Sequence, residues 1–409
     1  MRRWQWLAIL ALVMGFVAGS FGPSTAQTDD VSMLVSGNNA FAFELYHAVS
    51  DSGDNLILSP YSISSALAMT YAGARGNTEQ QMADTLNFTL PQEQLHPAFQ
   101  ALDLALTPAE STDPEEEPLQ LNIANALWAQ VDYDFLVDYV DLVAQYYEAG
   151  LQELDFETDP EGSRQTINDW VSEETEERIT DLLAEGTITP DTRLVPTNAI
   201  YFKGGWLSKF DPEFTRDQPF YLLDGSEVTV PMMSQTIMFP YVDGEGYQAF
   251  SMPYAGGQAA MLVLLPDADN FEAFEESLTA EQFQTVLDSV MPVELMLSMP
   301  RFEYESGFEL DDTLISLGMS DAFDPDNADF SGMTGGPDLF ISAVIHKAFV
   351  KLDESGTEAA AATAVIMAPT AAQENTPVPV VVDRPFLYVI YDQTTGSILF
   401  IGRVLNPAS

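Results

Sequence analysis

The sequence contains no cysteine. This absence excludes disulfide bonds, catalysis by a thiol, cysteine-based metal sites and the attachment of a lipid to a cysteine. A chain of 409 residues, 46% of them hydrophobic, is long enough to bury a large core. We therefore expect a globular protein that is stabilised by packing alone.

Basic residues are scarce as well. The chain has 14 Lys and Arg against 63 Asp and Glu, which gives a formal net charge of -49 at pH 7. Nucleic acids and anionic membranes bind to basic patches, so neither is an expected partner, and the same argument excludes a polyanionic cofactor. We interpret the acidic composition as an adaptation to a saline or acidic exterior, where high net charge keeps a protein soluble.

Long apolar runs are limited to one, at the N-terminus. Two arginines precede an apolar segment from Trp6 to Ala18, and small residues follow it, including Ala26. This arrangement predicts a signal peptide over residues 1–26, with an uncleaved membrane anchor as the alternative. The mature chain, residues 27–409, is then expected to be secreted, extracellular and free of the membrane after signal cleavage.

Local signatures of enzyme active sites are absent. The three histidines are His47, His96 and His346, and no HExxH, GxSxG or P-loop pattern occurs. His346 lies in an apolar segment, which is typical of a hydrogen-bonded core histidine. We expect no catalytic residue, metal or cofactor; an exported hydrolase with a Ser-His-Asp triad is the alternative, and it lacks a local motif.

The periodic segments favour one large domain of the α+β class. Apolar residues at helical spacing predict helices in the first half of the chain, including one from Glu161 to Leu183, and a later helix from Gly307 to Gly318. From Arg193 onward, short alternating or apolar runs predict strands. Neither an internal repeat nor a flexible linker divides residues 27–409.

The segment that follows Asp353 carries two conflicting signals. A capping-box spacing and a run of alanines predict a helix, yet residues 340–352 and 378–391 on either side predict strands. In an extended chain alternate side chains share one face, and every second residue from Thr357 to Val365 is small or β-branched. Such a face fits a narrow gap between two strands, where a lysine or a large aromatic residue would not.

Five segments of the sequence together resemble the serpin family of protease inhibitors, as a secreted member of the bacterial type. They are NLILSPYSISSALAMTYAGARGNTEQQM, INDWVSEETEERI, LVPTNAIYFKGGW, VIHKAFVKLDESGTEAAAATA and VDRPFLYVIYDQTTGSILFIGRVLNP. They follow the family's order from about Phe41 to Pro407. The resemblance implies the serpin fold, with three β-sheets, surrounding helices and an exposed reactive-centre loop. The hinge and the reactive-centre loop together are expected at residues 353–385 of a single serpin domain.

The resemblance also implies a mechanism. A target protease cleaves the loop as a substrate and is trapped as an acyl-enzyme, while the cleaved loop inserts into the central sheet as a new strand. The expected partners are extracellular serine proteases, with papain-like cysteine proteases as an option, and the expected state is a monomer. The alternative is a non-inhibitory member that acts as a binding or carrier protein; the small hinge residues favour inhibition.

The family's motifs assign roles to individual positions. The hinge comprises Glu354, Gly356, Thr357, Glu358, Ala359, Ala360, Ala361, Ala362 and Thr363. The shutter, a polar cluster beneath the sheet that governs its opening, comprises Ser59, Ser62, Asn198 and His346. The breach, where insertion starts, comprises Trp206, Arg301 and Glu354, with Arg301 paired to Glu354.

The family's spacing from the hinge glutamate places the reactive bond between Thr370 and Ala371. Because residues 371–385 exceed the family's usual length, the alternatives for the recognised residue are Met367, Ala368, Ala371 and Ala372. Small neutral side chains favour a protease of elastase-like or subtilisin-like specificity. A trypsin-like protease would require Lys or Arg, and neither occurs between Lys351 and Arg384.

Overall fold

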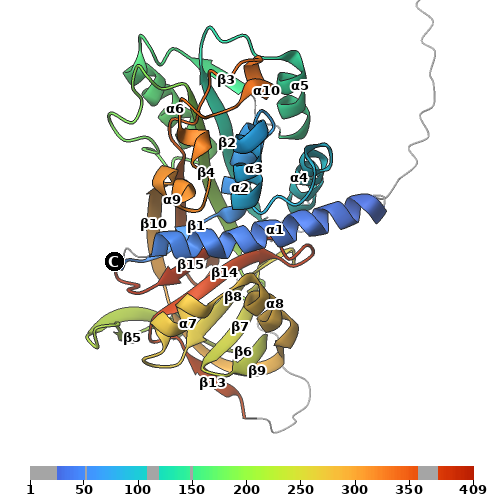
Figure 1. Ribbon diagram of the computed structural model, residues 1–409. Coiled ribbons are helices and arrows are strands. Elements are labelled where there is room, and N and C mark those ends of the chain that lie inside the picture. Colours follow the sequence, from blue (N-terminus) through green and yellow to red (C-terminus); the bar gives the residue numbers. More distant parts are fainter. Residues whose placement is uncertain (1–24, 51–52, 108–118, 148–150, 358–375) are drawn as a thin grey trace, which may run out of the picture.

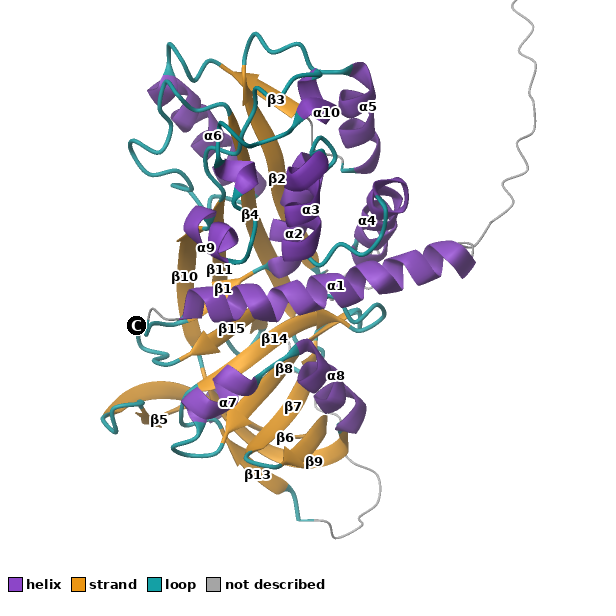
Figure 2. Ribbon diagram, in the orientation of Figure 1, coloured by secondary structure: helices purple, strands orange, loops and turns teal. Residues whose placement is uncertain are grey.

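The computed structural model describes residues 25–50, 53–107, 119–147, 151–357 and 376–409 (Figures 1 and 2). Its α-helices are α1 (Thr25–Val49), α2 (Pro60–Tyr71), α3 (Gly76–Thr85), α4 (Gln92–Leu106), α5 (Val137–Tyr146), α6 (Pro160–Glu174), α7 (Phe271–Ser277), α8 (Ala280–Ser289), α9 (Asp311–Ser316) and α10 (Ser331–Thr334). Figure 2 shows α2 to α6 gathered at one end of the molecule, α1 across its middle, and a strand-rich opposite end.

The strands form two hydrogen-bonded sheets. They are β1 (Leu56–Leu58), β2 (Gln120–Gln130), β3 (Leu151–Leu154), β4 (Leu194–Gly205), β5 (Arg216–Tyr221), β6 (Glu227–Gly244), β7 (Tyr247–Pro253), β8 (Ala259–Pro266), β9 (Met291–Pro300), β10 (Phe302–Glu309), β11 (Ile345–Leu352), β12 (Gly356–Thr357), β13 (Val378–Val381), β14 (Phe386–Asp392) and β15 (Ile398–Val404). The six-stranded sheet has the order β10-β11-β12-β4-β2-β3. The nine-stranded sheet has the order β1-β15-β14-β8-β7-β6-β9-β13, and β5 also pairs with β6.

The long strand β6 explains why two sheets are found where three were expected. Its first part pairs with β5 and β9, and its last four residues, Tyr241 to Gly244, pair with β7. One strand thus belongs to two groups of strands and joins them into a single hydrogen-bonded sheet. The expected fold class, helices combined with several sheets, is confirmed.

The six-stranded sheet is covered on both faces. The large hydrophobic core lies on its inner face, where it includes Ile200 and Phe202 of β4. A second, smaller core on the outer face joins α6 to the sheet and includes Ala199. Because both faces are covered, eleven of the twelve residues of β4 are buried, and the strand is a continuous rather than an alternating apolar run.

Two expected helices differ from the observed elements. The helix expected from Glu161 to Leu183 ends at Glu174, since Glu176 and Glu177 adopt left-handed φ values of 50° and 62°. The helix expected from Gly307 loses its first three residues to β10, which pairs there with β11. In both cases tertiary pairing or a turn overrides a helical pattern.

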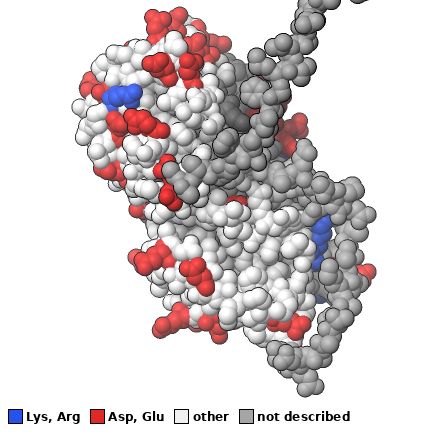
Figure 3. All heavy atoms as spheres, turned by 90° about the vertical axis from the view of Figure 1, so that its right-hand side faces the viewer, with Lys and Arg blue, Asp and Glu red and all other residues white. Residues whose placement is uncertain are grey.

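The surface carries the charge imbalance of the sequence. Figure 3 shows acidic side chains scattered over one face, with few basic ones. Within the described ranges, no helix combines the length and the apolar character needed to cross a membrane. The expected signal peptide, residues 1–26, lies outside the described residues except for its last two positions, at the start of α1.

Candidate functional site

The parallel strands β4 and β11 are neighbours in the six-stranded sheet, and we call the boundary between them the seam. The seam is closed at one end, where the two strands pair directly, and open at the other, where they are separated. At the closed end, Thr197 to Ile200 pair with Ile345 to Ala348. At the open end β12 lies between the two strands, and Thr357 pairs with Gly204 on one side and Leu352 on the other. β12 is antiparallel to both neighbours, so its extension would replace one parallel pairing by two antiparallel ones, which are slightly more stable per residue.

The register of the seam is the same at both ends. The pairing of Thr197 with Ile345, continued along both strands, places Gly204 opposite Leu352, and these are the two residues that flank Thr357. The strands can therefore separate at the closed end without sliding along each other. An extended β12 would keep its register with both of them.

An ion pair lies beside the open end of the seam. The carboxylate of Glu354, whose side chain is 8% exposed, accepts hydrogen bonds from Nε of Arg301 at 2.8 Å and from its Nη2. The hydroxyl of Thr215 donates to the same oxygen. The Arg301 side chain is 41% exposed, so solvent screens the attraction, but the carboxylate is largely removed from water and depends on these donors.

Trp206 fixes the turn between β11 and β12. Its backbone N–H donates to the carbonyl of Ser355 at 2.8 Å, and its indole Nε1 donates to the carbonyl of Asp353 at 3.0 Å. The indole stacks on the ring of Tyr254, with centroids 4.6 Å apart and planes 16° from parallel. Burial raises the pKa of Asp353, whose carboxylate caps the turn by accepting from the N–H of Ser355.

The two residues of β12 fit the open end closely. The Thr357 side chain is buried, and its Oγ1 lies 2.7 Å from the hydroxyl of Tyr254. A Cβ on Gly356 would lie 2.1 Å from the carbonyl oxygen of Gly204, a contact that no side chain tolerates. Glycine is therefore required where β12 enters the sheet.

The four expected shutter residues meet at the closed end of the seam. Ser59 is the N-cap of α2, where its Oγ accepts from the N–H of Ser62, and Pro60 occupies the first helical turn. Asn198 of β4 donates its Nδ2 to the Oγ of Ser62. Across the seam, Nδ1 of His346 bonds to Oδ1 of Asn198. These bonds connect both strands of the seam to the helix beneath them.

His346 is held in its neutral form. Its Nε2 accepts a hydrogen bond from the backbone N–H of Ser59 at 3.1 Å, so Nδ1 carries the proton and donates to Asn198. The imidazole is fully buried, and burial lowers its pKa to about 3. A proton on Nε2 would break the bond to Ser59 and place a charge in the core.

Three residues of this site were not expected from the sequence. They are Asn125, Thr215 and Tyr254, which contact Asn198, Glu354 and Thr357, respectively. Each lies far along the chain from its partner, and an isolated Asn, Thr or Tyr carries no signal of its own. Strand alternation was the available signal for Asn125, which shares the inner face of β2 with the apolar Ile123 and Leu127.

The other candidate residues lie outside the described part of the chain. They are Glu358, Ala359, Ala360, Ala361, Ala362 and Thr363 of the hinge, Thr370 and Ala371 of the expected reactive bond, and the alternatives Met367, Ala368 and Ala372. Among the residues that are described, no three His, Asp or Glu side chains are placed to hold a metal ion.

Comparisons with known proteins agree on one family. A family model described as serpin (serine protease inhibitor) matches residues 36–407. An uncharacterised serpin-like protein of Thermococcus kodakarensis is 39% identical over 375 residues, which cover 91% of this chain and 86% of that protein. The leukocyte elastase inhibitor of Equus caballus is 39% identical over 390 residues, which cover 92% and 100%. The solved structure of human thyroxine-binding globulin with thyroxine matches with a TM-score of 0.82 at 30% identity, covering 92% and 99%.

Proposed function

Because the chain belongs to the serpin family, whose model is described as serine protease inhibitor, we propose that it traps serine proteases as a suicide substrate. The proposed targets are extracellular proteases of elastase-like or subtilisin-like specificity. The proposed reactive bond joins Thr370 and Ala371. After cleavage, the loop is proposed to insert as a strand between β4 and β11, which prevents release of the protease.

The half-open seam is the observation that carries this proposal. Two residues of a new strand already lie within it, in register with both neighbours. In the same register, Ala359 would lie between Phe202 and Val350, Ala361 between Ile200 and Ala348, and Thr363 between Asn198 and His346. All six of these flanking residues are buried, so the small side chains of the tract match the space that an opening sheet provides.

Insertion must also break the closed end of the seam. The strand would separate the four pairs of β4 and β11 and the bond between Asn198 and His346. Thr363 would arrive between these two side chains, where its hydroxyl can donate to one and accept from the other. The shutter residues thus hold β4 and β11 together before cleavage. After insertion, hydrogen bonds to Thr363 would replace the bond between Asn198 and His346, so the native state can be metastable.

The proposed chemical step is an interrupted proteolysis. The serine oxygen of the protease attacks the carbonyl carbon of Thr370, and the peptide bond to Ala371 breaks. The serine proton passes through the protease's histidine to the released amine, and an ester joins the two proteins. Insertion then pulls the attached protease away, and its distorted site no longer activates the water that would cleave the ester.

We further propose that the protein acts outside the cell. The N-terminal segment supports this, because two arginines, an apolar core and small residues follow the order of a cleaved secretory signal. The lack of cysteine suits any redox environment, so it adds nothing to the choice of compartment.

A carrier function is the second candidate. The likeness to thyroxine-binding globulin, solved with thyroxine, supports it. The small and uncharged inner face of the hinge supports inhibition instead, because a carrier has no need to insert its loop.

Incubation of the purified protein with an elastase-like and a subtilisin-like protease tests the proposal. A complex that survives denaturing electrophoresis is the expected result, with a released C-terminal fragment that begins at Ala371 by mass spectrometry. The matched control is the same protease with its catalytic serine replaced by alanine, which forms no ester. Cleavage without a stable complex would favour the carrier function, and a fragment that begins elsewhere would correct the reactive bond.

A further inference from the structure

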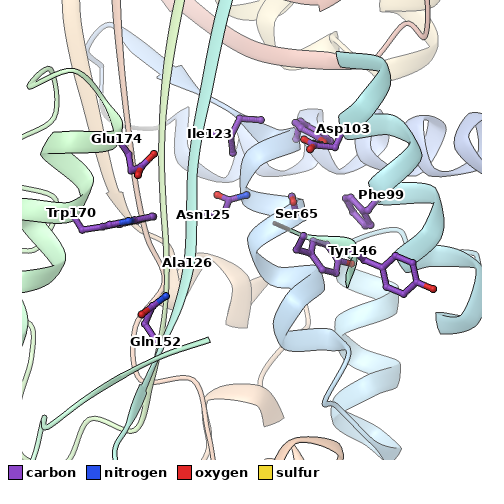
Figure 4. A pocket seen from close by; sticks show the side chains of 12 residues that line it. Ser65, Phe99, Asp103, Ile123, Asn125, Ala126, Tyr146, Gln152, Trp170 and Glu174 are labelled. Carbon is purple, nitrogen blue, oxygen red and sulfur yellow. Dashed lines mark hydrogen bonds between the residues drawn. The ribbon is translucent and has the colours of Figure 1, made fainter. Parts of the chain in front are cut away.

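A cavity of about 350 Å³ lies between α2, α4 and α6 at the edge of β2. Figure 4 shows Phe99 and Asp103 of α4 on one side, Trp170 and Glu174 of α6 on the other, and β2 between them. The pairing of β2 with β3 begins only at Leu127, so this part of β2 has a paired strand on one side only, within the described residues. The cavity is thus bounded by this edge of β2, by residues of the four helices α2, α4, α5 and α6, and by Gln152 of β3.

The lining of this cavity is aromatic and acidic. Its aromatic side chains are Tyr61, Phe99, Tyr146, Tyr147 and Trp170. Its carboxylates are Asp103, which accepts a hydrogen bond from the hydroxyl of Tyr61 at 3.2 Å, and the exposed Glu174. Among the described residues that line it, none is Lys or Arg.

We propose that this cavity binds a small organic cation with an apolar body. Aromatic faces and carboxylates both attract positive charge, and the rings also bury apolar surface. An anion of the same shape would be repelled by the two carboxylates of the lining, and a neutral molecule would gain only the apolar contact. The cavity's volume is at the lower end of the range found for small-molecule sites, which suits a ligand with one ring.

One wall of the cavity is also part of the polar cluster beneath the seam. Asn125 lines the cavity, and its Oδ1 accepts hydrogen bonds from Ser62 at 3.3 Å and from Asn198. Asn198 in turn bonds to His346 across the seam that insertion must open. A ligand that displaces or fixes Asn125 would alter its bond to Asn198, the residue whose bond to His346 insertion must break. We therefore expect the ligand to bind differently before and after the sheet opens, which is the requirement for regulating that step.

Binding is tested by calorimetry on the intact, uncleaved protein with three probes at 0.15 M salt, a common physiological ionic strength. They are phenethylammonium, the neutral 2-phenylethanol and the ammonium ion. We expect saturable binding of phenethylammonium at one site, about tenfold or more tighter than either other probe. Equal affinity for the cation and the alcohol, or no saturable binding of the cation, would overturn the proposed site.

Two variants locate the binding. Asp103→Asn combined with Glu174→Gln is expected to reduce the affinity for phenethylammonium to that for 2-phenylethanol. Glu173→Gln, at the neighbouring exposed position of α6, removes one negative charge just outside the lining and is expected to leave the affinity unchanged. An equal loss in both would show that the general negative charge, and not the cavity, attracts the probe.

Regulation is tested separately, because it rests on the proposed function whereas binding does not. Insertion is measured from the melting temperature, which circular dichroism gives for the protein before and after cleavage of its loop. The inserted form is expected to melt at a much higher temperature. We expect saturating phenethylammonium to change the rate of this conversion at least about threefold, a coupling of under 1 kcal/mol. Binding without any change in rate would refute the regulation and keep the site, and a protein that never converts would refute the proposed function.

Discussion

The hydroxyl of Tyr254 lies 2.7 Å from Oγ1 of Thr357, and this contact fixes which face of the hinge points into the core. Tyr254 is itself held by stacking on Trp206 and by an edge contact with Phe202, whose ring centroid is 4.9 Å away. If the loop inserts as a strand, every second residue after Thr357 would share this buried face. The first residue of this face is therefore the most informative position to change.

If the chain inhibits proteases as proposed, we predict that Thr357→Arg turns it into a substrate. A guanidinium at this position would have to enter the core beside Tyr254 without a carboxylate partner, at a cost of several kcal/mol. Insertion then stalls and the protease escapes by deacylation. The number of inhibitor molecules consumed per trapped protease is expected to rise about tenfold or more. Thr357→Ser retains the hydroxyl and is the control; an unchanged stoichiometry in the arginine variant would contradict the insertion mechanism.

Removal of the guanidinium beside Glu354 is expected to loosen the open end of the seam. Arg301→Ala leaves a largely buried carboxylate with the Thr215 hydroxyl as its remaining side-chain donor, and we expect about 1–2 kcal/mol of lost native stability. The midpoint of urea unfolding measures the loss. The control is Lys351→Ala, because the exposed pair of Lys351 and Glu303 contributes about 1 kcal/mol or less. Equal losses in the two variants would mean that burial of Glu354 is unimportant.

Gly356→Ala is expected to expel β12 from the sheet. The added Cβ would meet the carbonyl oxygen of Gly204 at 2.1 Å, and backbone cannot yield as a flexible side chain does. Hydrogen exchange at the N–H of Trp206, which donates to the carbonyl of Ser355, should become faster as the turn detaches. At Gly307 the nearest atom to a Cβ is 3.8 Å away, so Gly307→Ala should leave this exchange unchanged. Protection that survives in Gly356→Ala would rule out the close fit.

Acid is expected to destabilise the native state through two buried histidines. Burial lowers the pKa of His346 to about 3 and is the main cause that lowers the pKa of His96 to about 4, from the ordinary histidine value of 6.5. Between these values the unfolded chain binds a proton on each imidazole and the folded chain does not, so stability falls as the pH falls below 6.5. At pH 5 each histidine should account for about 2 kcal/mol of loss relative to neutral pH.

The matched test of this pH dependence is His346→Gln, which can still accept from Ser59 and donate to Asn198. Urea midpoints at pH 7 and pH 5 should differ less in the variant than in the parent, because one titrating group is gone. The many surface carboxylates titrate alike in both proteins, so they cancel in the comparison. An equal difference between the two pH values in parent and variant would show that His346 does not resist protonation.

Local sequence patterns were sufficient for most of the fold. Alternating and apolar runs predicted the strands after Arg193, because successive side chains of any strand point to opposite faces of its sheet. That pattern can be read from a short stretch of sequence. The pattern failed at Gly307 to Glu309, where pairing with β11 decides the conformation, and after Glu174, where two left-handed residues end the helix. The pairing partner of such a residue is distant in the chain, so a short window of sequence cannot reveal it.

The residues of the site could be predicted only where a family motif linked positions that are far apart in the chain, because the sequence itself gives no distance between them. The resemblance to a family identified Asn198 and His346 together, and the structure places them in contact across the seam. Asn125, which bonds to Asn198 from the neighbouring strand, has no such motif and was missed. This contact depends on the register between β2 and β4, in which Asn125 lies directly opposite Asn198.

The outer face of the inserted strand yields a last prediction, on charge. In the register of β12, Glu358 would enter the sheet between Lys203 of β4 and Lys351 of β11, two of only 14 basic residues in the chain. Both lysines are partly exposed, so each attraction is modest, but the two act at the first step of insertion.

We expect the double variant Lys203→Glu and Lys351→Glu to slow trapping several-fold, because three carboxylates would meet on adjacent strands. Adding Glu358→Lys to the double variant should restore most of the lost rate, as measured by rapid mixing with an excess of protease. Lys347→Glu reverses a charge on the same face of β11, further along the seam and opposite the expected place of Ala362. Because Glu358 does not reach that position, Glu358→Lys should fail to rescue Lys347→Glu. Rescue in both backgrounds would place the inserted strand in a different register.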